Sequence, residues 1–215
     1  MVRGVLFDFD NTLVYSEPSR WLSTNDTLRE FNVGMSEEEW KGEYKRLDSR
    51  AIFQSMKEKH HLDYNVEEMY KKAHKRRIKI EKEEGVEMIE GARELLHFLL
   101  EHEVAVAICT GGTKEHCQML MDMNGFPPVD VIARGDYEKG KPNPDCYFAG
   151  LRKLNLYAEE VLVFDDSYNG LLAGIKANCR VVAVNTQGER DLEKLDIFRK
   201  IENYTELDFE ELLRL

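Results

Sequence analysis

Two aspartates separated by one residue, Asp8 and Asp10, are the first side chains along the sequence whose spacing suits chemistry. The apolar run 5–7 precedes them and predicts a short buried strand that ends where the aspartates begin. In an open parallel sheet, ligands bind at that end of a strand. Alternation along an extended chain puts both carboxylates on one side, where two like charges are unfavourable unless a cation or a proton lies between them. The pair therefore indicates a cation-binding or proton-sharing site, although surface turns also carry aspartate pairs.

Two other apolar runs of the sequence also end in polar side chains. The run 104–108 leads into Thr110, and the run 161–164 leads into a second aspartate pair, Asp165 and Asp166. If these runs form parallel strands, their carboxyl ends meet at one edge of the sheet, and side chains far apart in the sequence come together there. We therefore expect a single polar site at this edge, built around the two aspartate pairs.

The sequence also supplies the elements that must position these side chains. Apolar runs predict strands at 5–7, 104–108, 129–132, 161–164 and 181–184, and amphipathic stretches predict helices at 92–102, 113–124, 145–154 and 168–177. Near-continuous apolar strands that alternate with helices are typical of a parallel sheet covered on both faces. We therefore predict a three-layer α/β core, followed by a polar helical end of the chain.

Residues 16–88 do not share this alternation. Apolar side chains recur there at helical spacing, and no strand-like run occurs. Ser36, which precedes three glutamates, and Asn65 both fit helix N-caps. Gly34 and Gly85 fit positions just past a helix end. This segment is predicted to be a small bundle of helices inserted after the first strand.

Length and composition fit this organisation. The chain has 215 residues, 42% of them hydrophobic, which suffices for one core domain that carries an insertion. The predicted α/β core consists of residues 1–15 and 89–215, and the predicted helical domain consists of residues 16–88. A dense run of basic residues at 71–77 lies among glutamates, so we interpret it as a solvated helix face.

Charge and cysteine usage exclude several classes of function. The formal net charge of −11 argues against general nucleic-acid binding, which needs a basic surface. No apolar run approaches the roughly 20 residues of a membrane span, and the first residues do not resemble a secretory signal. The four cysteines are widely spread and form no C-x-x-C pair, which indicates reduced thiols. These features predict a cytoplasmic protein with neither nucleic acid nor membrane as a partner.

Four short motifs occur in order at the predicted strand ends and in one loop between them. They are Asp8-x-Asp10-x-Thr12, the segment 106–112, the segment 140–145 and the segment 164–167. This set resembles the haloacid dehalogenase superfamily of phosphatases and mutases, in the branch of β-phosphoglucomutase and phosphoglycolate phosphatase-like hydrolases. The resemblance covers the whole core and implies a Rossmann-like sheet with a helical cap. It also implies a small phosphorylated metabolite as substrate and, as is frequent in that branch, a monomer.

The resemblance implies a role for each of the four aspartates. Asp8 would be the nucleophile that attacks phosphorus and forms an aspartyl phosphate. Asp10 would protonate the leaving alcohol and then activate the attacking water. A Mg²⁺ ion would be held by the Asp8 carboxylate, the Asp10 backbone carbonyl and Asp166, with Asp165 behind them or bound through water. The metal would neutralise charge, which phosphoryl transfer needs above all.

The resemblance also assigns the groups that would hold the phosphate. Thr110 and the backbone N–H of Gly111 lie before a predicted helix, where anions bind readily. Lys141 would neutralise Asp8 and the phosphate together. Arg20 follows the first motif closely and lies in the segment expected to face the substrate, so it is a candidate for contact with a second anionic group. The alternative for Arg20 is a solvated arginine on the surface of a helix.

The predicted function is a Mg²⁺-dependent phosphatase that hydrolyses a small phosphate monoester, such as a sugar phosphate or phosphoglycolate. The alternative is a phosphomutase of the β-phosphoglucomutase type, but Arg20 stands about where those relatives carry a histidine. A dehalogenase would have little use for Asp10 or Asp166. A phosphate-binding protein without activity would not be expected to keep all five of the side chains Asp8, Asp10, Thr110, Lys141 and Asp166.

Overall fold

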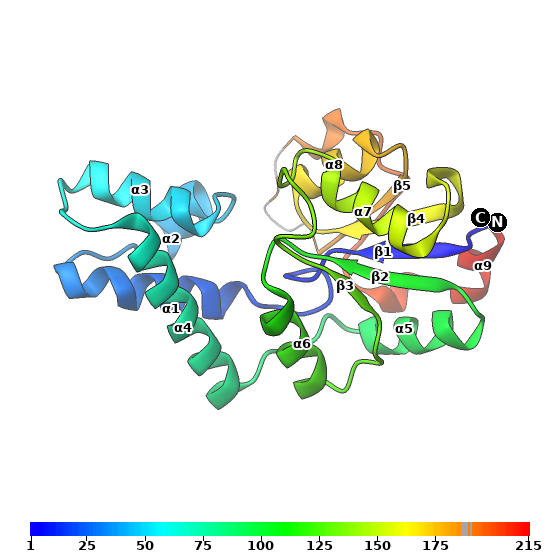
Figure 1. The fold of residues 1–215 in the computed structure, drawn as a ribbon, viewed down its shortest axis with the longest axis horizontal. Coiled ribbons are helices and arrows are strands. Elements are labelled where there is room, and N and C mark those ends of the chain that lie inside the picture. The colour runs from blue at the N-terminus through cyan, green and yellow to red at the C-terminus, as the bar shows by residue number, and fades with distance from the viewer. Residues whose placement is uncertain (186–188, 190) are drawn as a thin grey trace. The chain divides into compact units, whose positions relative to one another are not determined.

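The computed structural model of the protein describes residues 1–185, 189 and 191–215. The chain forms two compact units: a core unit, made of Met1–Tyr15 and Val86–Leu215, and a helical unit, Ser16–Gly85 (Figure 1). The return to the core occurs at Val86 rather than at residue 89. The reason is local pairing, since the Tyr15 N–H donates to the Glu87 carbonyl at 2.7 Å.

The core unit is built on a six-stranded parallel sheet with the order β3-β2-β1-β4-β5-β6. Its strands are β1 (Gly4–Phe7), β2 (Ala105–Cys109), β3 (Asp130–Ile132), β4 (Val161–Asp165), β5 (Arg180–Val184) and β6 (Arg199–Ile201). The predicted α/β sheet is confirmed. The prediction of a purely helical C-terminal end was wrong, because the short polar segment of β6 extends the edge of the sheet beside β5.

Helices cover both faces of this sheet, as Figure 1 shows. The core unit contains α5 (Ala92–Glu101), α6 (Lys114–Met123), α7 (Asp145–Leu154), α8 (Tyr168–Lys176) and α9 (Phe209–Arg214). Val5 and Phe7 of β1 pack on the face covered by α5, α6 and α9, whereas Leu6 packs on the face covered by α7 and α8. Because both faces are buried, the four central strands β1, β2, β4 and β5 are apolar at nearly every position.

The helical unit contains α1 (Glu17–Leu28), α2 (Glu37–Glu39), α3 (Ser49–Lys59) and α4 (Val66–Glu84), with α1 and α3 both packed on α4. Ser36 forms the predicted capping box with Glu39, and the Asn65 side chain caps α4. Gly85 follows the end of α4 as predicted. Gly34 does not end a helix, because the chain leaves α1 earlier and turns through a left-handed Asn32.

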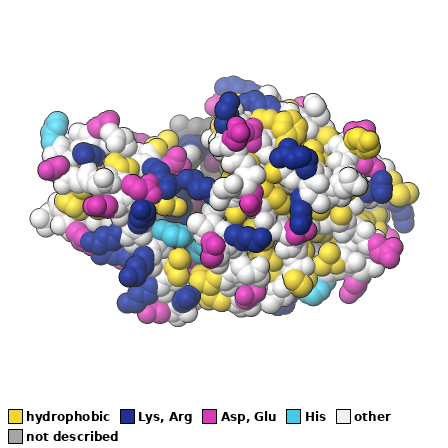
Figure 2. All heavy atoms as spheres, viewed as in Figure 1, with side chains coloured by type: hydrophobic (Ala, Val, Ile, Leu, Met, Phe, Trp, Pro, Cys, Tyr) yellow, Lys and Arg dark blue, Asp and Glu magenta, His cyan; other side chains and the backbone are white. Residues whose placement is uncertain are grey.

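Most of the basic run of α4 is a solvated face, as the sequence indicated, but Arg77 is an exception, because its side chain is only 13% exposed and pairs with the fully buried Glu81. Figure 2 shows lysine and arginine side chains along α4 with acidic side chains among them. Lys72 and Arg76 both pair with Glu30, and Lys79 pairs with Glu83. No helix in the described part of the chain is long and apolar enough to cross a membrane.

Candidate active site

The first aspartate of each pair lies at the carboxyl edge of the sheet, on neighbouring strands. β1 lies between β2 and β4, and Phe7 is in register with Ile108 and Phe164. The next residue, Asp8, donates its backbone N–H to the Phe164 carbonyl at 2.8 Å. Asp8 therefore lies beside Asp165, the last residue of β4.

Lys141 joins these two aspartates, although it comes from the loop before α7. Its Nζ atom lies 2.5 Å from Oδ1 of Asp8 and 2.7 Å from Oδ2 of Asp165. The Asp165 side chain is fully buried, and the side chains of Lys141 and Asp8 are only 14% and 12% exposed. Burial opposes the charge of Lys141, but the two carboxylates outweigh it and hold the Lys141 pKa well above its ordinary value. Lys141 is thus a fixed cation of the site.

The site holds more negative charge than Lys141 balances. Burial raises the pKa of Asp8 to about 7, and the charge of Asp165 adds to the increase, while Lys141 lowers the pKa. A net increase means that ionised Asp8 is destabilised where it stands. A bound cation would remove this cost.

The carboxylates provide oxygen ligands for such a cation. Oxygen atoms of Asp8, Asp165 and Asp166 all lie within 4.8 Å of one another. The Thr12 hydroxyl lies between two of them, 3.4 Å from Oδ2 of Asp8 and 3.4 Å from Oδ1 of Asp166. Clustered carboxylate oxygens are the donors that Mg²⁺ prefers, so the residues present fit this ion.

Asp165 accepts hydrogen bonds from several donors within the protein. Its Oδ2 accepts from the Tyr147 hydroxyl at 2.5 Å as well as from Lys141. Its Oδ1 accepts from both the N–H and the hydroxyl of Ser167, each at 2.9 Å. The Ser167 hydroxyl also accepts from the Gly170 N–H and so caps α8. With both oxygens bonded within the protein, Asp165 is suited to organise the site rather than to bind a ligand directly.

Gly170 makes room for that carboxylate. A Cβ atom placed on Gly170 would lie 1.9–2.1 Å from the carboxylate atoms of Asp165. The first turn of α8 can therefore pass over Asp165 only without a side chain at this position. Neither Gly170 nor Tyr147 stands out in the sequence, because both lie within ordinary helical segments.

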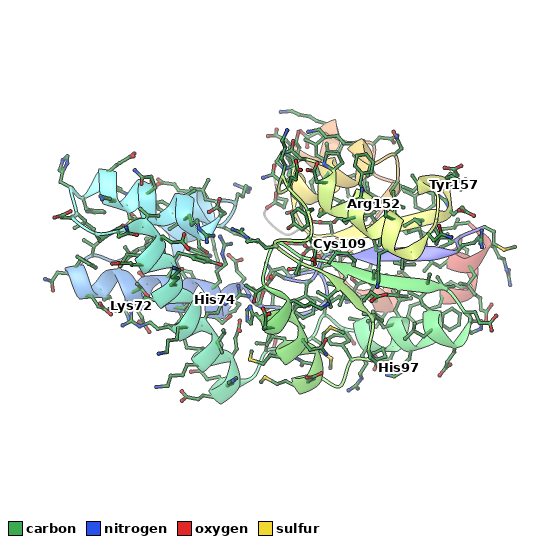
Figure 3. The ribbon with its side chains drawn as sticks, in the orientation of Figure 1. Lys72, His74, His97, Cys109, Arg152 and Tyr157 are labelled. Atoms are coloured by element: carbon green, nitrogen blue, oxygen red, sulfur yellow. The ribbon has the colours of Figure 1, made fainter. Side chains whose placement is uncertain are left out.

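The second motif lies close to the first. Thr110 follows Cys109, the last residue of β2, which Figure 3 labels. The Thr110 hydroxyl oxygen accepts a hydrogen bond from the Gly112 N–H at 3.0 Å. A Cβ atom placed on Gly112 would lie 3.3 Å from that oxygen and 4.0 Å from Oδ2 of Asp10. Asp10 and Thr110 therefore flank the same glycine.

The cysteines near the site are poor nucleophiles. All four cysteines of the chain are buried and free. Cys109 precedes Thr110, and Cys146 follows the Lys141 loop at the start of α7. Burial raises the pKa of the Cys109 thiol well above its ordinary value and that of Cys146 to about 11. Both thiols are protonated at neutral pH, and the thiolate is the reactive form.

Arg20, the remaining candidate, belongs to the helical unit and is engaged there. Its guanidinium donates to the carbonyl groups of Lys45, at 2.8 Å, and Leu47. It also lies 3.9 Å from the carboxylate of Glu17 and 5.1 Å from the ring centre of Trp40. These contacts favour a structural role over a role in binding substrate.

Replacing Arg20 with methionine is expected to lower the free energy of unfolding by about 2 kcal/mol, because two carbonyl groups lose a charged donor. Chemical denaturation that follows the fluorescence of the tryptophans, both in the helical unit, measures this loss. Arg29→Met is the control, because the Arg29 side chain is 64% exposed and, among the described residues, pairs only with the partly exposed Asp26 three positions earlier. Unchanged stability together with a higher KM would instead identify Arg20 as a substrate contact.

The sequence of this chain is similar to a known enzyme family and to several characterised enzymes. The family model described as "Haloacid dehalogenase-like hydrolase" matches residues 5–184. Hexitol phosphatase A of Escherichia coli is 27% identical over 211 residues, which cover 87% of this chain and 85% of that protein. The phosphorylated carbohydrates phosphatase of Thermotoga maritima is 26% identical over 178 residues, which cover 82% of each chain.

Solved structures show the same fold at low sequence identity. CbbY from Rhodobacter sphaeroides in complex with phosphate superimposes with a TM-score of 0.85, at 20% identity and 97% coverage of each chain. The β-phosphoglucomutase of Clostridium difficile superimposes with a TM-score of 0.82, at 14% identity, and covers all of this chain and 96% of its own.

Proposed function

The chain belongs to the haloacid dehalogenase-like hydrolases as a phosphoric monoester hydrolase, and we propose that it releases phosphate from a small phosphorylated sugar or similar metabolite, with Mg²⁺ and through an aspartyl-phosphate intermediate. The main support for this proposal is the buried Asp8 carboxylate, which lies 2.5 Å from Lys141 Nζ and within 4.8 Å of carboxylate oxygens of Asp165 and Asp166. A cytoplasmic monomer remains the prediction for its location and state.

Asp8 is the nucleophile in this proposal. One of its oxygens is held by Lys141, while the other, among the residues that the structure describes, has only the long 3.4 Å contact with the Thr12 hydroxyl. That second oxygen attacks phosphorus, the bond from phosphorus to the alcohol oxygen breaks, and a phosphoaspartate forms. The Asp8 carboxylate and the substrate phosphate are both negative and repel each other. Lys141 would allow them to come into contact by neutralising the charge of both.

Asp10 moves the proton in both halves of the proposed reaction. In the first half it gives a proton to the departing alcohol oxygen. In the second half it takes a proton from the water that attacks phosphorus, and the bond between phosphorus and Asp8 breaks to release phosphate. A Cβ atom placed on Gly112 would lie 4.0 Å from Oδ2 of Asp10, which supports a place for Asp10 next to the proposed phosphate-binding residues.

Asp8 and Asp166 would hold the Mg²⁺ ion, together with the backbone carbonyl of Asp10. Asp165 would act behind them or through water, because its oxygens already accept from Lys141, Tyr147 and Ser167. When bound, the ion would neutralise the charge that develops on the transferred phosphoryl group. Thr110, Gly111 and Lys141 would bind the remaining phosphoryl oxygens.

Metal removal and a substrate panel test the function. We expect the purified protein to release inorganic phosphate from one or more phosphorylated sugars, hexitols or phosphoglycolate with Mg²⁺, and to lose at least about 100-fold of this rate in excess EDTA. Adding Mg²⁺ back should restore the rate, which controls for damage by the chelator. Metal-independent release of equal rate would contradict the proposed metal site.

The same panel of substrates distinguishes a phosphatase from a phosphomutase. A phosphomutase is the alternative function, because the chain shares its fold with β-phosphoglucomutase. A mutase would consume a sugar phosphate and form its isomer without stoichiometric phosphate. ³¹P NMR of each reaction distinguishes the two results, because it reports free phosphate and every phosphate ester at once.

A further inference from the structure

Three consecutive carbonyl groups of the second motif are bonded by one neighbouring segment. The Tyr137 hydroxyl donates to the Thr110 carbonyl at 2.9 Å. Arg134 donates twice, from Nε to the Gly111 carbonyl at 3.1 Å and from its backbone N–H to the Gly112 carbonyl at 3.0 Å. Both donors come from the loop that follows β3. We call residues 110–112 the phosphate loop and these three bonds its clamp.

The clamp determines which groups of the phosphate loop remain for a ligand. The carbonyl oxygens of the phosphate loop point toward Arg134 and Tyr137, which donate to them. The negative ends of these carbonyl groups are therefore not available to repel an incoming anion. The Gly112 N–H donates to the Thr110 hydroxyl oxygen, which leaves the hydroxyl proton for another acceptor. Within the part of the chain that the structure describes, the Gly111 N–H has no hydrogen-bond acceptor.

The bonds of the clamp also form a connected chain. The peptide between Gly111 and Gly112 accepts from Arg134 at its carbonyl and donates to Thr110 at its N–H. A charged donor at one end of such a chain polarises the next bond and strengthens it. Burial raises the pKa of Tyr137 to about 12, so its hydroxyl keeps its proton and remains a donor at neutral pH.

We propose that Arg134 and Tyr137 are positioning residues, which hold the phosphate loop so that the Thr110 hydroxyl and the Gly111 N–H meet the phosphoryl oxygens. This inference rests on the proposed phosphatase function. Donors that are in place before the reaction stabilise the transition state most, because they need no reorganisation as charge develops. Neither Arg134 nor Tyr137 needs to touch the substrate for this purpose.

An alternative role for Arg134 has to be separated from the clamp. The guanidinium is exposed, and among the described residues no carboxylate pairs with it, so it is also able to contact a substrate anion directly. Tyr137 distinguishes the two roles. Its hydroxyl is uncharged and already bonded to Thr110, so its removal affects the loop but removes no anion-binding charge.

The test uses the full chain with the variants Arg134→Gln and Tyr137→Phe. Arg152→Gln and Tyr157→Phe are matched controls, because both residues are exposed and lie in the last turn of α7 and in the segment after it, where Figure 3 labels them. Four quantities are measured for each protein: the amide exchange rate of Gly112 by NMR, the affinity for inorganic phosphate with Mg²⁺ by calorimetry, and both kcat and KM on the best substrate.

We expect both clamp variants to speed exchange at Gly112 and to weaken phosphate binding about 5- to 10-fold, the equivalent of one lost hydrogen bond. We expect kcat to fall about 10- to 100-fold, since small errors of position are costly in the transition state. The controls should match the wild type, and the unfolding midpoint should show that all variants remain folded.

Two results would contradict the proposed role of the clamp. One is unchanged Gly112 exchange in both variants. The other is a normal Tyr137→Phe enzyme beside an Arg134→Gln enzyme that changes only in KM, which would make Arg134 a substrate contact. Failure of the proposed function gives a different result: the wild type would hydrolyse nothing, while exchange and phosphate affinity would still respond to both variants.

Discussion

Replacing Asp8 with asparagine is expected to reduce phosphate release at least about 1000-fold, because a carboxamide cannot form the phosphoaspartate. The substitution keeps the size of the side chain and leaves an oxygen for the hydrogen bond from Lys141. Mass spectrometry should detect phosphate on the wild type during turnover and none on the variant. Steady-state rates on the best substrate of the panel give the size of the loss.

The same substitution is expected to leave the stability of the metal-free protein unchanged or to increase it. The pKa of Asp8 is raised from its ordinary value of 3.8 to about 7 in the folded protein. The unfolded chain therefore gives up this proton first as the pH rises, so that ionisation of Asp8 costs folding free energy above about pH 4. Denaturation in EDTA at pH 8 measures the relief of that cost in the variant.

Asp130→Asn is the control for Asp8→Asn, because Asp130 is half exposed and pairs with Lys153 at the surface. Its activity and stability should match the wild type. A rate for Asp8→Asn within tenfold of the wild type would exclude Asp8 as the nucleophile. A large loss of stability would instead show that Asp8 is needed mainly to compensate Lys141.

Replacing Gly170 with alanine is expected to be the most damaging change that alters no charged or hydrogen-bonding group. The new methyl group would overlap the Asp165 carboxylate, 1.9–2.1 Å away, and that carboxylate is fully buried. Moving Asp165 would break its bonds with Lys141, Tyr147 and Ser167. Overpacking together with disruption of a buried ion pair is expected to cost about 3–5 kcal/mol of folding free energy.

Activity of Gly170→Ala should fall at least about 100-fold, because Lys141 and the cluster of aspartates lose their common partner. Urea denaturation measures the stability, and calorimetric titration with Mg²⁺ measures the metal site separately from catalysis. Gly42→Ala is the control, since nothing lies within 4 Å of the position of its Cβ and its backbone is not left-handed. Wild-type values for both glycine variants would show that Asp165 moves without consequence.

The sequence by itself determined most of the sheet and the edge of the sheet at which the candidate site lies. Runs such as 104–108 and 161–164 are apolar throughout because both faces of their strands are buried, and this is visible without coordinates. The ends of those runs located Asp8, Thr110 and Asp165, since parallel strands share one carboxyl edge. Strand β6 escaped prediction because Arg199–Ile201 is short and polar, and as an edge strand it is set by pairing with β5 rather than by burial.

Only the tertiary structure decided what surrounds the predicted residues. Tyr147 and Gly170 reach Asp165 from α7 and α8, and Arg134 and Tyr137 reach the phosphate loop from the loop after β3. Apart from Gly170, which follows Asp165 closely in the sequence, each contact joins segments that are far apart along the chain, and no local pattern of polarity or spacing marks it. The contacts of Arg20 could not be predicted from the sequence either, because its partners Lys45 and Leu47 lie beyond the end of its own helix. Periodicity and motifs follow from local backbone geometry, whereas these contacts depend on how the elements pack.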